Sequence, residues 1–90
     1  MRCYSIVKNE YENRTLQFRL FRKGYYWGGC YGVEKSKELE EIEIDFPYVI
    51  YFDEVARKNP FLTFSGLENI ELNRDKYKRI KLNIIEEIEV

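Results

Sequence analysis

The chain has 90 residues, of which 44% are hydrophobic and 17% aromatic, and its formal net charge at pH 7 is −1. This length has room for one core, so we expect a single globular domain over residues 1–90. The aromatic content and the small net charge exclude a disordered chain. No apolar run approaches the roughly 20 residues of a membrane span, and the N-terminus lacks the apolar region of a signal peptide. We therefore expect a cytoplasmic protein without membrane contact, located in the host cell cytoplasm if it is viral.

The N-terminal third of the chain predicts an antiparallel β-meander. Its three strands are expected at residues 2–8, 14–22 and 25–33. The middle one gives the clearest signal, because apolar and polar side chains alternate there with a period of two. Its buried face would carry Leu16, Phe18 and Leu20, whereas Phe21 would face outward.

The rest of the chain adds shorter strands and short helical segments. Residues 34–41 read as a short helix or a charged loop, and residues 54–58 as a helical turn capped by Asp53 and stopped by Pro60. Strands are expected at residues 41–45, 48–52, 61–64, 67–72 and 76–90, with a turn at 65–66. The pattern predicts a mainly β fold, with α+β as the alternative, built as an antiparallel curved sheet or partial barrel of about 6–7 strands.

Charge is segregated along the chain. Residues 1–33 contain six Lys or Arg and two Glu, for a net +4, and residues 34–54 contain two Lys and eight acidic residues, for a net −6. Residues 55–90 contain seven basic and six acidic residues, for a net +1. Either the basic and acidic segments lie side by side and their charges compensate, as on an ordinary protein surface, or the molecule has two faces of opposite charge that orient a partner.

The residues needed for common catalytic and metal sites are missing. The chain has no histidine, which excludes Ser-His-Asp and Cys-His catalysis and the usual zinc ligand sets. It also lacks a phosphate-binding glycine loop. We therefore expect no enzyme, no cofactor and no metal. Cys3 and Cys30 are expected as reduced thiols, unless their strands are neighbours and form a disulfide.

Aromatic and basic residues suitable for contacting a partner concentrate near residues 23–24, which connect the second and third predicted strands. Tyr, Trp and Arg are favoured anchors of protein interfaces. The candidate binding residues are Arg19, Phe21, Arg22, Lys23, Tyr25, Tyr26, Trp27 and Tyr31. If the sheet is covered on both faces, these rings belong to the core instead. A second candidate interface consists of carboxylates that could imitate phosphates: Glu34, Glu38, Glu40, Glu41, Glu43 and Asp45.

In size, strand content and lack of catalytic residues, the chain is similar to small accessory proteins of phages and mobile elements, including anti-CRISPR inhibitors and toxin-immunity proteins. No motif carries this similarity, so it assigns no residue a role. We expect a non-enzymatic inhibitor or immunity-type factor that docks on a larger protein or nucleoprotein complex, with a homo-oligomer left open.

Two alternatives stay open. One is a nucleic-acid-binding module that uses the basic aromatic hairpin at residues 19–31. The other is a small histidine-free ribonuclease of the toxin type, in which Arg19, Arg22, Lys23 and Tyr25 would act.

Overall fold

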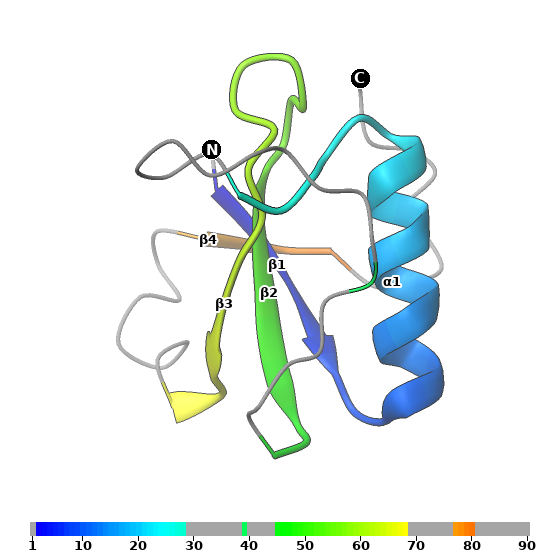
Figure 1. Ribbon diagram of the computed structural model, residues 1–90. Coiled ribbons are helices and arrows are strands. Elements are labelled where there is room, and N and C mark those ends of the chain that lie inside the picture. Colours follow the sequence, from blue (N-terminus) through cyan, green and yellow to red (C-terminus); the bar gives the residue numbers. More distant parts are fainter. Residues whose placement is uncertain (1, 29–38, 40–44, 69–76, 81–90) are drawn as a thin grey trace.

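Within the described part of the chain, the fold is mainly β, with one helix packed on a four-stranded mixed sheet (Figure 1). The structure is a computed structural model that describes residues 2–28, 39, 45–68 and 77–80. In chain order, its elements are β1 (Arg2–Val7), α1 (Glu10–Arg22), β2 (Tyr48–Asp53), β3 (Thr63–Gly66) and β4 (Tyr77–Arg79). The strand order is β3-β2-β1-β4, and the sheet that these described strands form is open rather than closed into a barrel.

Strand β1 lies in the middle of the sheet. It runs antiparallel to β2, with Arg2 opposite Asp53, and parallel to β4, with Arg2 opposite Tyr77. Strand β3 is antiparallel to β2, with Val49 opposite Ser65. The strands predicted at residues 2–8 and 48–52 are confirmed as β1 and β2. The expectation of a wholly antiparallel sheet is wrong, because β4 joins β1 in the parallel direction.

Residues 10–22 form a helix, and the strand predicted at residues 14–22 is wrong. The helix begins after Asn9, whose side-chain oxygen accepts the Glu12 N–H at 2.9 Å. The Glu12 carboxylate in turn accepts the Lys8 N–H at 2.7 Å. A polar N-cap followed three residues later by Glu satisfies backbone donors that a helix start leaves open, and it is a typical helix-start signal.

The buried side of α1 follows helical spacing. Its buried side chains come at intervals of three and one: Asn13, Leu16, Gln17, Leu20 and Phe21. Leu16 and Leu20 also fit a period of two, which made a strand plausible. Phe18 separates the two patterns, because a strand would bury it with the leucines and the helix leaves it 45% exposed.

A glycine ends the helix and turns the chain back onto it. Gly24 has a φ of 103°, and its N–H donates to the Phe21 carbonyl at 3.1 Å. The Tyr25 N–H donates to the Leu20 carbonyl at 3.0 Å, which completes a Schellman cap. The described residues 25–28 form no strand, although Tyr26 makes an isolated parallel bridge to Phe61. The part of the strand predicted beyond residue 28 lies outside the described residues.

Side chains of β2 are buried on both faces of the sheet. Tyr48, Ile50 and Phe52 of β2 belong to the main core, which also contains the buried side of α1. Val49 and Tyr51 point to the other face and pack with Tyr4 of β1 in a second cluster. Every residue of β2 from 48 to 52 is buried, as the continuous apolar run predicts.

The segment after β2 differs in detail from the prediction. Asp53 accepts the Val55 N–H at 2.9 Å, and the Lys58 N–H donates to the Val55 carbonyl, so the expected capped segment is a hydrogen-bonded turn. Strand β3 contains Ser65 and Gly66, which were predicted as a turn. Most residues of four other predicted elements lie outside the described part of the chain: the strands at 41–45, 67–72 and 76–90, and the short helix at 34–41.

Candidate docking surface on α1

The solvent-facing side of α1 exposes two aromatic side chains. Tyr11 is 75% exposed and Phe18 is 45% exposed, although both lie on a regular element that is anchored to the core. A helix repeats every 3.6 residues, so the backbone positions of Tyr11, Thr15, Phe18 and Arg22 follow one another along one side of α1 at spacings of four, three and four. We call the set Tyr11, Arg14, Thr15, Phe18 and Arg22 the α1 outer face.

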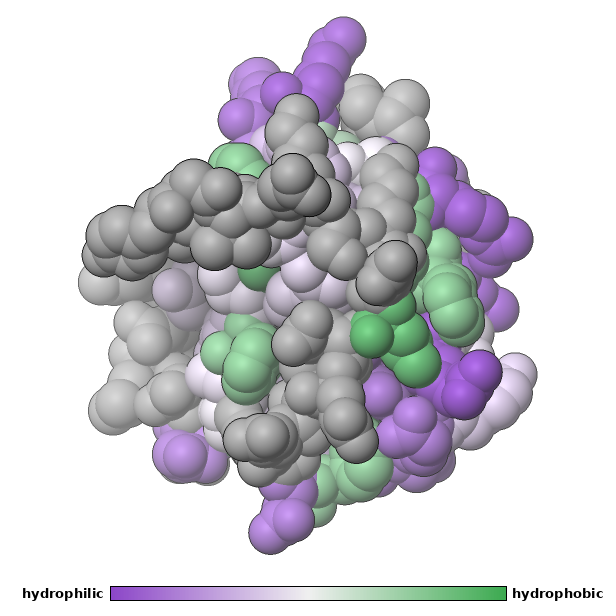
Figure 2. All heavy atoms as spheres, in the orientation of Figure 1, coloured by the Kyte–Doolittle hydropathy of each residue, from purple (hydrophilic) through white to green (hydrophobic). Residues whose placement is uncertain are grey.

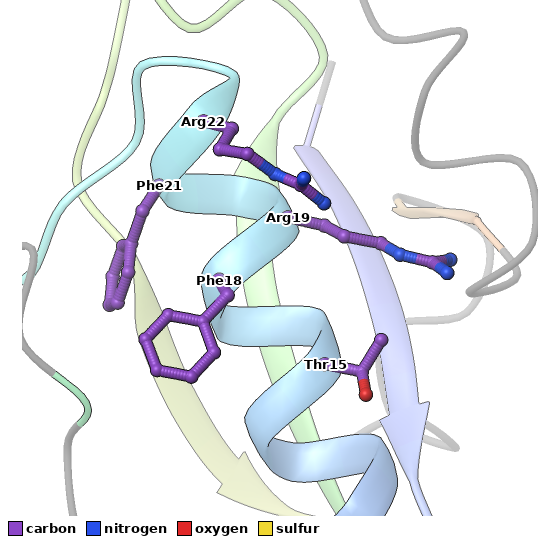
Figure 3. A pocket seen from close by; sticks show the side chains of 5 residues that line it. All are labelled: Thr15, Phe18, Arg19, Phe21 and Arg22. Atoms are coloured by element: carbon purple, nitrogen blue, oxygen red, sulfur yellow. The ribbon is translucent and has the colours of Figure 1, made fainter.

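Phe18 is held in place by the helix and by its neighbour. Its ring meets the buried ring of Phe21 edge to face, with centroids 6.1 Å apart and planes at 77°. Such pairs stabilise beyond the area they bury. Figure 3 shows both rings on one side of α1, whereas Arg19 and Arg22 extend from another side. An aromatic ring that is packed on one side and open on the other suits contact with a partner.

The same turns of α1 line a groove of about 560 Å³. Its described lining residues are Thr15, Phe18, Arg19, Phe21 and Arg22. Figure 2 shows hydrophobic surface bordered by strongly hydrophilic side chains on the side of the molecule where α1 lies. The groove therefore combines apolar walls with guanidinium groups, which can form paired hydrogen bonds to carboxylates.

The charges on α1 follow its backbone dipole. Glu10 and Glu12 lie in the first turn, and Arg19 and Arg22 lie in the last. Each sign opposes the partial charge at that end of the helix. The C-terminal half of the outer face is consequently basic, and its Arg22 is exposed.

Three of the predicted binding residues, Phe21, Tyr25 and Trp27, lie in the core rather than on the surface, and Phe21, which was expected to face outward, is 5% exposed. Tyr25 is 0% exposed and Trp27 is 7% exposed. The Tyr25 hydroxyl donates to the Asp53 carbonyl, and its ring meets Phe52 at 5.5 Å. Burial raises the pKa of Tyr25 well above its usual value, which keeps the hydroxyl protonated. The physical reason for this correction is the helix: the chain leaves the end of α1 and returns along the core.

Trp27 takes part in a buried row of polar side chains. Its indole N–H donates to the Gln17 side-chain oxygen at 2.9 Å, and the Gln17 amide donates to the Asn13 oxygen at 2.8 Å. The Tyr48 hydroxyl donates to the same Asn13 oxygen. All four residues are buried. This row, Asn13-Gln17-Trp27-Tyr48, joins α1 to β2 and to the chain after the helix, so it positions α1 rather than a ligand.

The remaining predicted site residues fall into two other places. Lys23 and Tyr26 line a separate, smaller pocket at the C-terminal end of α1. Among the predicted acidic residues, Asp45 is exposed. The other five predicted acidic residues lie outside the described residues: Glu34, Glu38, Glu40, Glu41 and Glu43. The same holds for Tyr31 and Cys30. Cys3 is buried in β1, and burial raises the pKa of its thiol.

Sequence reasoning missed Tyr11, Arg14 and Phe18 as surface residues. The signal that identifies them is the helical spacing of the buried positions, which places these three on the opposite side. Gly24 after Arg22 and the Asn9–Glu12 pair before the apolar residues mark the two ends of the helix. Both signals favour the helix, whereas the alternation of Leu16, Phe18 and Leu20 favours a strand.

Comparisons with known proteins found no matching family model, curated protein or solved structure. Among the residues that the structure describes, no helix has the length and apolar composition to cross a membrane. The same residues contain no group of three or more Cys, Asp or Glu side chains placed to hold a metal ion.

Proposed function

We propose that the protein is a non-enzymatic binding factor that docks on a larger protein through the α1 outer face. The observation that carries the proposal is the 45% exposure of Phe18 on a helix that is otherwise fixed to the core. Within this class, an inhibitor or immunity-type factor of a phage or mobile element fits a chain of this size. Its action would consist of covering a surface that the larger protein needs.

The chemistry of the α1 outer face defines the partner. Exposed aromatic rings need an apolar recess, and Arg14 and Arg22, both exposed, favour carboxylates around it. We therefore expect an acidic protein surface with an apolar centre. The buried row Asn13-Gln17-Trp27-Tyr48 fixes the rotation of α1, so the backbone that carries the ring and the guanidinium groups does not have to be ordered on binding.

Burial of Phe18 gives the expected size of the effect. A buried phenylalanine removes about 150–250 Å² from water, so covering the exposed 45% of the ring buries about 90 Å² more. At about 25 cal/mol per Å², this contributes about 2 kcal/mol, or about 30-fold in Kd.

The test compares two phenylalanines of similar exposure. Phe18 is 45% exposed and Phe46, which precedes β2, is 42% exposed. Immobilised wild-type protein, Phe18→Ala and Phe46→Ala are each incubated with lysate of the native host, and the bound proteins are quantified by mass spectrometry. We expect a protein that wild type and Phe46→Ala retain and Phe18→Ala loses. The Kd of that protein, once purified, should rise about 30-fold for Phe18→Ala.

A second variant separates docking from a change in the fold. Arg14 is exposed and precedes the groove, so Arg14→Glu should leave the circular dichroism spectrum and the unfolding midpoint unchanged. It should nevertheless weaken the same complex, more strongly at low salt. If all variants retain the same proteins with the same affinities, α1 is not the docking surface.

A further inference from the structure

A second, smaller pocket lies at the C-terminal end of α1. It has a volume of about 360 Å³ and is formed by the helix end together with the turn that follows β2. Its described lining residues are Lys23, Gly24, Tyr26, Ala56, Arg57 and Pro60. Most of the lining surface is apolar, and Lys23 and Arg57 contribute to it from two different segments. Figure 1 places both segments at the same end of the molecule.

The walls of this pocket are held by backbone hydrogen bonds. The Tyr26 N–H donates to the Pro60 carbonyl at 2.9 Å, and the Leu62 N–H donates to the Tyr26 carbonyl at 3.0 Å. The Tyr26 ring meets the Phe61 ring edge to face, with centroids 5.2 Å apart. The pocket is therefore formed before any ligand arrives, which lowers the entropic cost of binding.

Small residues make the pocket hollow. A Cβ placed on Gly24 would lie 3.6 Å from the Cβ of Ala56, so the helix end and the turn approach each other without a larger side chain between them. The positive φ of Gly24 also disfavours any other residue at this position. The same glycine that ends the helix therefore leaves the pocket open.

Basic side chains lie in both segments that form the pocket. Among the described residues of these segments, Lys23, Arg57 and Lys58 are basic, and Asp53 and Glu54 are acidic. Arg57 and Lys58 are exposed. A ligand that satisfies both parts of the pocket needs a flat, weakly polar body for the centre and an anionic group for the rim.

We propose that this pocket binds one nucleotide unit of a single-stranded nucleic acid. The base would contact the Tyr26 ring and Pro60, and the phosphate would lie beside Arg57 and Lys23. Aromatic and apolar contacts of this kind accept any base, while cations hold the backbone. A carboxylate alone would meet the cations but leave the apolar centre unfilled. The inference goes beyond docking through α1 and concerns different residues, so each can fail without the other.

The test uses a short fluorescein-labelled oligothymidylate and the full chain, with binding measured by fluorescence anisotropy at about 50 mM and about 200 mM salt. We expect salt-sensitive binding. Arg57→Glu should weaken it about tenfold and reduce the salt slope by about 1. Lys8→Glu is the matched control. Lys8 is exposed and directly follows the last residue of β1, away from the pocket. Its replacement by glutamate changes the charge by the same amount as Arg57→Glu. It should alter the Kd by less than about twofold.

Chemical shifts of backbone amides identify the site and the ligand class. Adenosine monophosphate should shift the Gly24, Tyr26 and Ala56 resonances at lower concentration than adenosine or inorganic phosphate alone. A glutamate-rich peptide is the competing macromolecule, and the proposal is overturned if it shifts the same resonances at equal or lower concentration. The proposal is also overturned if no oligothymidylate binds at low salt, or if Lys8→Glu weakens binding as much as Arg57→Glu. Phe18→Ala should leave oligothymidylate binding unchanged.

Discussion

Replacing Trp27 by alanine tests whether the rings after α1 belong to the core. The indole is 7% exposed and packs edge to face against Phe64, with centroids 6.1 Å apart. Its N–H is the donor to the Gln17 oxygen. If the ring instead anchored a partner, its loss would weaken binding and leave the fold intact. In the present structure, its loss should destabilise the protein.

The expected cost has two parts. Truncating a buried tryptophan to alanine typically costs about 3–5 kcal/mol. Leaving the buried Gln17 oxygen without its donor adds about 1–3 kcal/mol. Folded domains have only about 0.05–0.15 kcal/mol of stability per residue. For a chain of 90 residues, Trp27→Ala therefore removes a large part of the free energy of unfolding and is expected to bring the protein close to unfolding at 25 °C.

Urea denaturation followed by far-ultraviolet circular dichroism measures the effect without relying on the tryptophan signal. Trp27→Phe keeps a large ring and removes the N–H, so it should cost about 1–3 kcal/mol from the unpaired Gln17 oxygen. Phe18→Ala is the control for loss of an exposed ring, and it should cost less than Trp27→Ala. A free energy of unfolding for Trp27→Ala within about 1 kcal/mol of wild type would refute the placement of this ring.

Three further perturbations follow from the ends of α1 and from the buried tyrosines. Asn9→Ala removes the acceptor of the Glu12 N–H and should lower the free energy of unfolding by about 1 kcal/mol, whereas Asn9→Asp should retain it, as urea titration would show. Gly24→Ala should lower the free energy of unfolding by about 1–2 kcal/mol, because alanine disfavours a φ of 103°. The cost should not be larger, because the neighbouring Ala56 leaves room for the methyl group. Burial raises the pKa of Tyr25 and of Tyr48 above their unfolded value near 10. Folding thus favours the neutral hydroxyls, and their contribution to the free energy of unfolding is fully present below about pH 10. Above that pH, each tyrosine should lower the free energy of unfolding by up to about 1.4 kcal/mol per pH unit. Urea titrations between pH 8 and pH 11 would detect the fall, and a constant midpoint would contradict it.

The two central strands could be predicted because their side chains agree with one structure only. Residues 48–52 are apolar throughout, which suits a strand covered on both faces, and the structure buries all of them. The helix was missed because Leu16 and Leu20 are compatible with both periods. The choice depended on Asn13 and Gln17, which look exposed in a sequence and are buried because Trp27 and Tyr48 provide their partners. Pairings between distant residues of this kind are not visible in a local pattern.

The candidate site was predicted in composition but not in arrangement. A hairpin would have gathered the basic and aromatic residues at one tip. The helix separates them instead: Phe18 and Arg22 lie on its outer face, Trp27 enters the core, and Tyr26 lines the pocket at the helix end. Arg57 was not singled out, because its position beside Tyr26 depends on the approach of the turn after β2 to the end of α1.

The position of β1 between an antiparallel and a parallel neighbour has a consequence for how the chain acquires its structure during synthesis. The Ser5 hydroxyl donates to the carbonyl of Ile80, a residue 75 positions later. During synthesis, β1 therefore lacks its β4 neighbour until the β4 residues emerge from the ribosome. Such long-range closure makes folding slow, and an unpaired strand edge invites association with other chains. A ribosome-bound chain stalled before β4 should consequently recruit chaperones that the released protein does not need.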